Sequence, residues 1–131
     1  MNKYHNKKTV LDGIKFDSKK EANRYAELTL MAKAGAISNL ELQPRFELLP
    51  AFGLRGKKYR KCEYVADFGY WEGDCYVIED VKSAFTKKNP LYQLKKKMLL
   101  RLLSTVDGIQ EVLSKQPLRL ATTYIRFVEY D

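Results

Sequence analysis

Apolar residues recur along the first third of the chain at spacings that predict a hairpin followed by a helix. Short apolar runs within residues 9–16 flank Asp12-Gly13, a dipeptide typical of two-residue hairpin turns. Ser18 and Glu21 have the spacing of a capping box, and apolar positions at helical intervals continue to a stop at Gly35. A first helix is therefore predicted between Ser18 and Gly35.

The middle of the chain has the alternating pattern of strands. One strand is predicted over residues 37–49, with a break at Pro44 that suggests a sheet edge or a bulge. Residues 50–56 are expected to form a loop. The β-branched and aromatic residues of 58–71 predict a long strand, and residues 75–82 the next one.

The last third predicts a second helix and a final strand. Asn89-Pro90 is a favourable helix start, and the helix should continue to about Ser104. Asp107-Gly108 should break it before a short helical turn over residues 109–113, and residues 118–130 should form the last strand. The apolar face expected on the second helix comprises Leu91, Leu94, Met98 and Leu102.

This order of elements predicts one mixed α/β domain over residues 1–131, with residues 1–8 as a flexible basic arm. No apolar run is long enough to span a membrane, and the basic N-terminus lacks the apolar stretch of a secretory signal. A cytoplasmic protein is therefore expected.

Charge suggests a polyanionic partner, since 24 Lys and Arg against 16 Asp and Glu give a net charge of +8. A solubilising surface would explain that total equally well, but the cations are clustered, which suits phosphate groups better than an even scatter. The clusters comprise Lys57, Lys58, Arg60 and Lys61, and then Lys95, Lys96 and Lys97.

The cysteines and the histidine exclude several kinds of active site. Cys62, Cys75 and His5 are too few for a zinc site made by one chain, and the single histidine in the N-terminal arm argues against a Ser-His-Asp or Cys-His centre. The cysteines should be reduced. Any metal must be held by carboxylates, which favours Mg²⁺ or Mn²⁺.

The acidic hairpin between residues 64 and 82 is the strongest chemical signal. If Gly73-Asp74 is its turn, Asp67 pairs with Asp80, and Lys82 shares their face. Glu79 would then point to the other face. A one-residue slip would put Asp67 beside Glu79 instead. The residues expected around Glu79 are Tyr64, Ala66, Phe68, Val77 and Val81.

Facing carboxylates repel unless positive charge lies between them, and a divalent ion with a neighbouring Lys supplies it. Phosphodiester hydrolysis needs the same groups: carboxylates to hold the ion, and a Lys to orient water and neutralise the phosphate. The plainer interpretation is a solvated hairpin face with ordinary Asp and Lys. Asp within an apolar strand argues against that interpretation, because Asp is a poor strand former.

These residues resemble the PD-(D/E)XK nuclease superfamily, whose signature is an Asp on one strand and (D/E)-x-K on the next. Asp67 and Asp80-Val81-Lys82 match it, and Glu21 matches the acidic residue common on the first helix. Ala66 stands where the signature has Pro. The chain resembles more closely a family of small phage and prophage proteins of unknown function grouped with this superfamily. The matching segments are residues 16–21, 42–46, 64–68 and 77–82.

The resemblance implies an αβββαβ restriction-endonuclease-like core and Mg²⁺-dependent DNA cleavage, with Asp67, Asp80 and Glu21 as metal ligands and Lys82 as a further catalytic residue. It also suggests that Gln93, Lys95 and Lys96 contact DNA, although Lys95–Lys97 fit a solvated helix face as well. Glu21 could serve only as a helix cap.

The expected substrate is branched or duplex DNA, including Holliday junctions, in phage recombination or replication. Symmetric cutting of a junction would need a homodimer. A non-catalytic nucleic-acid-binding module on the same fold and an RNA-directed protein remain alternatives.

Overall fold

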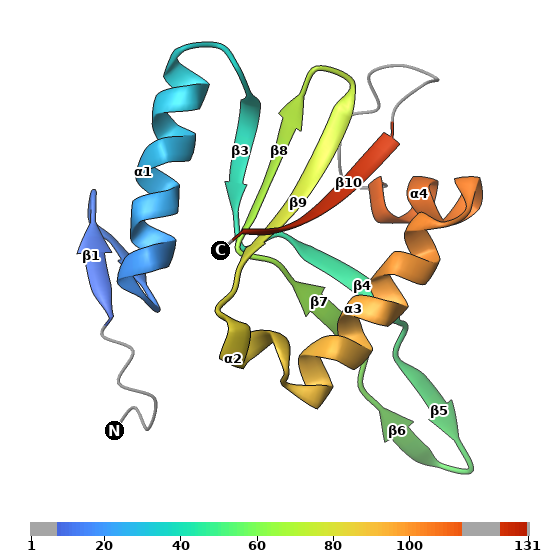
Figure 1. Cartoon of the computed structure of the whole chain (residues 1–131). Helices are drawn as coiled ribbons and strands as arrows, with labels where there is room; N and C mark the ends of the chain where they lie inside the picture. Colours follow the sequence, from blue (N-terminus) through green and yellow to red (C-terminus); the bar gives the residue numbers. More distant parts are fainter. Residues whose placement is uncertain (1–7, 114–123, 131) are drawn as a thin grey trace.

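The computed structural model describes residues 8–113 and 124–130, and a mixed four-stranded sheet lies at its centre (Figure 1). The strand order is β10-β9-β8-β3, with β10 parallel to β9 and the other pairs antiparallel. The strands comprise Ser38–Leu42 (β3), Phe68–Glu72 (β8), Cys75–Val81 (β9) and Tyr124–Tyr130 (β10). With one helix before β3 and three between β9 and β10, the predicted mixed α/β fold is confirmed.

Helices cover both faces of the sheet. The long helix α1 (Lys19–Lys33) packs on the face that carries Phe68 and Val77, whereas α3 (Pro90–Leu103) and α4 (Val106–Val112) pack on the face that carries Trp71 and Ile78 (Figure 1). Two cores result, one on each side. Strand β9 contributes to both because successive side chains point to opposite faces.

Three pairs of short strands lie outside the central sheet. Strands β1 (Thr9–Leu11) and β2 (Ile14–Phe16) form the predicted hairpin, and its turn residues Asp12 and Gly13 have φ of 53° and 76°. The other two pairs are inserted between β3 and β8. They are β4 (Arg45–Leu49) with β7 (Cys62–Val65), and β5 (Phe52–Leu54) with β6 (Lys57–Tyr59).

Both long helices begin as the sequence predicts. The Ser18 hydroxyl accepts from the Glu21 N–H at 3.1 Å, and the Asn89 side chain accepts from the backbone N–H groups of Leu91 and Tyr92. Ala34 caps the end of α1, followed by Gly35 with φ of 81°. A one-turn helix, α2 (Ala84–Lys87), precedes α3.

Two strand predictions are wrong. The expected loop over residues 50–56 contains β5, and the expected long strand over 58–71 is split among β6, β7 and β8. The first break falls at Arg60-Lys61 and the second at Ala66-Asp67. Local propensity cannot reveal these breaks, because the residues on each side favour strands equally well.

Predictions for the last third need smaller corrections. Leu91 and Leu94 are 60% and 55% exposed, whereas Leu99 is the fully buried residue of α3. Helix α4 begins at Val106, so Asp107-Gly108 lies inside it rather than breaking the chain. The final strand is seen from Tyr124. The part predicted over residues 118–123, and residues 1–7 of the basic arm, lie outside the described residues.

Both cysteines are free, as expected. Among the described residues, none of the helices has the length and apolar character needed to cross a membrane.

Candidate active site

The candidate site forms where the chain leaves one sheet and enters another. Ala66 and Asp67 join β7, which pairs with β4, to β8, which pairs with β3 and β9. The Ala66 N–H donates to the Pro44 carbonyl at 3.1 Å, and the Gln43 N–H donates to the Asp67 carbonyl at 3.0 Å. The break between β3 and β4 is thus hydrogen-bonded to the break between β7 and β8. Side-chain alternation is reset here, because Ala66 packs in the α3-side core and Phe68 in the α1-side core.

Asp67 and Asp80 hold each other in place through the backbone. The paired positions in β8 and β9 run from Phe68–Glu79 to Glu72–Cys75, which confirms the predicted register. One step further, the Asp67 N–H donates to Asp80 Oδ1 at 2.8 Å, and the Val81 N–H donates to Asp67 Oδ2 at 2.8 Å. Asp80 therefore accepts from the backbone of Asp67, and Asp67 accepts from the residue after Asp80.

Burial destabilises the charged form of both acids. Asp80 is 1% exposed, and the Tyr64 hydroxyl donates to its second oxygen. Burial raises the pKa of Asp80 above its usual range, and the charge of Lys82 opposes that rise. Burial likewise raises the pKa of Asp67, although the hydrogen bond from the Val81 N–H and the charge of Lys82 both act to lower it. Neither acid forms an ion pair with another described residue.

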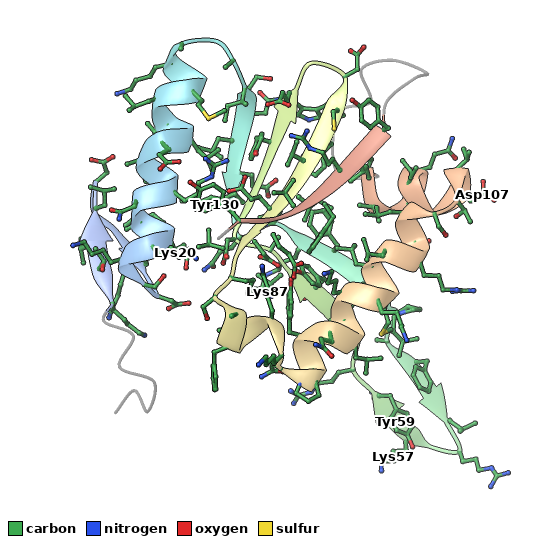
Figure 2. The ribbon with its side chains drawn as sticks, viewed as in Figure 1. Lys20, Lys57, Tyr59, Lys87, Asp107 and Tyr130 are labelled. Atoms are coloured by element: carbon green, nitrogen blue, oxygen red, sulfur yellow. The ribbon has the colours of Figure 1, made fainter. Side chains whose placement is uncertain are left out.

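Lys82 lies on the Asp80 side of the sheet, as predicted. Its ammonium lies 4.9 Å from the centre of the Tyr92 ring, and that ring contacts Tyr64. The Lys20 ammonium donates to the Lys82 carbonyl at 3.3 Å. Figure 2 labels Lys20 on the first turn of α1, beside the end of the sheet. The site thus has one cation directly after β9 and another on α1.

Glu21 is directed toward the same place. It is 7% exposed and lines a cavity of about 130 Å³ together with Asp67 and Gln43. Burial, and then the charge of Asp67, raises the pKa of Glu21 to about 7. The predicted acid of the first helix therefore shares a cavity with the predicted strand acid, in addition to its N–H serving the Ser18 cap.

Glu79 points to the opposite face, as predicted. Its oxygens accept from Arg24 Nε at 2.7 Å and Nη2 at 2.9 Å, and from the Tyr70 hydroxyl at 2.8 Å. The expected proximity to Tyr64 and Ala66 is wrong, because the strand break places both residues on the Asp80 side.

The donor chemistry of this cluster suits Mg²⁺, which binds proteins through one or two carboxylates and keeps several waters. Asp67 and Asp80 are adjacent acids without a paired cation, and each carboxylate has lone pairs beyond those its hydrogen bonds occupy. Within residues 8–113 and 124–130, no three His, Cys, Asp or Glu side chains are gathered closely enough to hold an ion. Glu21 is therefore near the pair without completing a three-ligand set.

The predicted DNA-contacting residues lie on two separate elements. Lys57 and Lys58 belong to β6, with Arg60 and Lys61 directly after it. On α3, Gln93 donates to the Lys87 carbonyl at 2.9 Å, and Lys96 pairs with Glu129 at 2.7 Å. Burial alone would raise the pKa of Glu129, but hydrogen bonds from Lys96 and Tyr92 outweigh it and lower that pKa. Lys95 is partly buried on the same helix.

Sequence analysis missed Tyr64, Lys20 and Gln43. Nothing in the sequence distinguishes Tyr64 from other strand tyrosines, because its contact with Asp80 depends on the strand break. Lys20 precedes Glu21 directly, which could have suggested it. Gln43 has φ of 51°, a left-handed conformation that is uncommon for residues with a side chain.

The chain belongs to the family described as protein of unknown function (DUF1064), whose model matches residues 1–113. No curated protein and no solved structure matches the chain significantly.

Proposed function

We propose that this family member is a metal-dependent endonuclease of the PD-(D/E)XK type that hydrolyses DNA phosphodiester bonds. The observation that carries the proposal is the pair Asp67 and Asp80, a half-buried acid and a buried acid held together by backbone donors at a strand break. A strand pair held only for stability would gain nothing from carboxylates whose charged form is destabilised by burial.

The surrounding groups have the chemistry that phosphoryl hydrolysis needs. Asp67 and Asp80 would hold Mg²⁺ or Mn²⁺, with Glu21 beside them in the cavity that it shares with Asp67. When bound, the ion would acidify water and stabilise negative charge on the phosphate. Lys82 would orient the attacking water and neutralise a phosphate oxygen. Lys20, which contacts the Lys82 carbonyl, would help to fix the position of Lys82.

Charge distribution favours a nucleic acid as the substrate. The chain carries a net charge of +8. Along the sequence, the cations of β6 precede Asp67 and Asp80, and those of α3 follow them. We propose DNA as the substrate and a role in phage recombination or replication, with branched DNA such as a Holliday junction as the preferred form and a homodimer as the active assembly.

The test is a panel of labelled linear, flap, fork and four-way DNA substrates incubated with Mg²⁺, with Mn²⁺ or with EDTA. Cleavage should occur with either ion and stop in EDTA. A matched RNA panel belongs in the same experiment. Binding without cleavage under every condition would indicate the non-catalytic module, and preferential cleavage of RNA would indicate the RNA-directed alternative.

A further inference from the structure

The β5–β6 hairpin is an exposed two-stranded ribbon that projects away from the central sheet (Figure 1). All six of its strand residues are exposed, and within residues 8–113 and 124–130 the strands β5 and β6 pair only with each other. Arg55 and Gly56 form its tip with φ of 51° and 79°. An isolated two-stranded hairpin is marginally stable in water, so a solvent-exposed one needs internal support.

That support is an aromatic stack on one face of the ribbon. The rings of Phe52 and Tyr59, which are cross-strand partners, lie 4.9 Å apart at 12° to each other. Lys57 extends over the Tyr59 ring at 5.4 Å, and Leu54 pairs with Lys57 on the same face. Phe52 and Leu54 remain 45% and 58% exposed. Figure 2 labels Lys57 and Tyr59 on this ribbon.

The other face of the ribbon is basic. Lys58 stands opposite Gly53, so its cross-strand partner has no side chain to pack against it. The segment from Leu48 to Cys62 contains five cations and no acidic residue. Two copies of this ribbon would therefore repel each other, which argues against a second copy of the chain as its partner. The partner must supply negative charge and flat, apolar rings together.

Unpaired nucleotides of DNA have both properties. Their phosphates are anionic, and their bases present ring faces that a fully paired duplex keeps stacked internally. We propose that the β5–β6 hairpin binds unpaired bases of branched DNA, with Phe52 and Tyr59 as the stacking platform and Lys58 and Arg60 against the phosphates. This inference rests on the proposed function and deepens it, because it assigns the preference for branched DNA to a particular element.

Affinity measured without metal tests the hairpin independently of cleavage. In EDTA, fluorescence anisotropy would compare a fully paired duplex with the same duplex carrying a bulge of unpaired thymidines. The variant Phe52→Ile/Tyr59→Val removes both rings but keeps an apolar, strand-favouring pair. It should bind the bulged DNA about fivefold to thirtyfold more weakly and leave affinity for the paired duplex unchanged.

Two matched variants serve as controls. Tyr59→Phe keeps the ring and should bind like the parent. Lys58→Ala/Arg60→Ala keeps the rings, and it should weaken binding to both DNAs. It should reduce the log–log salt dependence by about 1.4 where the two lost phosphate contacts are to unpaired strand, at about 0.7 each, and by about 1.8 on the paired duplex, at about 0.9 each. Unchanged circular dichroism would show that the variants are folded.

Equal weakening on both DNAs by the ring variant, or none on either, would overturn the inference. Tighter binding of the parent to a matched bulged RNA would overturn the assignment to DNA. If the parent and the ring variant cleave DNA equally well in Mg²⁺, the proposed function is supported and the proposed role of the hairpin is refuted. If binding depends on the rings but no DNA is cleaved, the role of the hairpin is supported and the proposed function is refuted.

Discussion

Two adjacent buried acids on β9 should respond in opposite ways to loss of their charge. Asp80 is 1% exposed and Glu79 is 0% exposed, so burial alone does not distinguish them. They differ in their partners. Glu79 is paired with Arg24, whereas Asp80 accepts, among the described residues, only from Tyr64 and a backbone N–H. Asp80→Asn should abolish cleavage and spare the fold, and Glu79→Gln should do the opposite.

The stability cost of Glu79→Gln follows from its contacts. The carboxylate is held at 2.7 and 2.9 Å by Arg24, whose side chain is 14% exposed, and at 2.8 Å by Tyr70. Breaking a buried pair by removing one charge costs about 3–5 kcal/mol. Arg24 retains Glu27 at 2.8 Å, so the low end, about 3 kcal/mol, is expected. For a chain of this size that lowers the melting temperature by about 10 °C.

Asp80→Asn avoids this cost. The Asn oxygen can still accept from the Asp67 N–H, and the Tyr64 hydroxyl can rotate to accept from the Asn amide. The substitution also removes a charge that burial destabilises, so stability should change by less than about 1 kcal/mol or increase. Cleavage should fall at least about a hundredfold, since losing even a supporting partner of a metal ligand costs about 10–100-fold.

The assay combines cleavage rates in Mg²⁺ with thermal unfolding of each variant. Trp71, the only tryptophan, is fully buried, so its fluorescence reports loss of the α3-side core. Cleavage should be measured well below the melting temperature of Glu79→Gln. An active Asp80→Asn together with a stable, inactive Glu79→Gln would refute the assigned roles of the two acids.

Three further predictions concern the same site. Glu21→Gln should be more stable than the parent by up to about 3 kcal/mol at pH 8, and the gain should vanish by about pH 4.5. The reason is that burial raises the pKa of Glu21 from 4.5 to about 7 in the folded protein. The stabilisation from its proton is complete below pH 4.5 and is lost as the pH rises through about 7. A pH-independent difference in unfolding free energy between the variant and the parent would contradict this prediction. Mg²⁺ should raise the melting temperature of the parent more at pH 8 than at pH 5, because metal and protons compete for the buried acids, and it should raise that of Asp80→Asn little at either pH. Gln43→Gly should melt no lower than the parent, because glycine adopts φ of 51° without strain. It should cleave DNA more slowly, because Gln43 lines the cavity with Asp67; parental cleavage rates would show that the side chain is dispensable.

Much of the fold was predictable because local signals determine it. Ser18 and Asn89 cap helices through their own side chains, and Gly73 adopts φ of 61° in the turn that sets the β8–β9 register. That register, together with the side-chain period of two, put Asp80 and Lys82 on one face and Glu79 on the other. Each of these signals depends on residues close together in sequence.

The strand break at Ala66-Asp67 was not predictable in this way. Tyr64 to Phe68 alternates like a continuous strand, and the hydrogen bonds that interrupt it come from Gln43 and Pro44, more than twenty residues earlier. The apolar face of α3 was misjudged for a related reason. Leu91, Leu94 and Leu99 have similar hydrophobicity, and only the position of the sheet determines which of them is covered.

The same break explains how the buried Asp80 and the half-buried Asp67 can lie side by side. In an unbroken ladder, the Asp67 and Val81 N–H groups would pair with carbonyl groups, and the two carboxylates would stand side by side without donors. Because β7 leaves the sheet at Ala66, these N–H groups are free to bind the carboxylates instead. The backbone thus stabilises two acids at the place where Glu21 and Lys82 also converge. Closing the break should therefore disrupt the candidate site even if every acidic residue is retained.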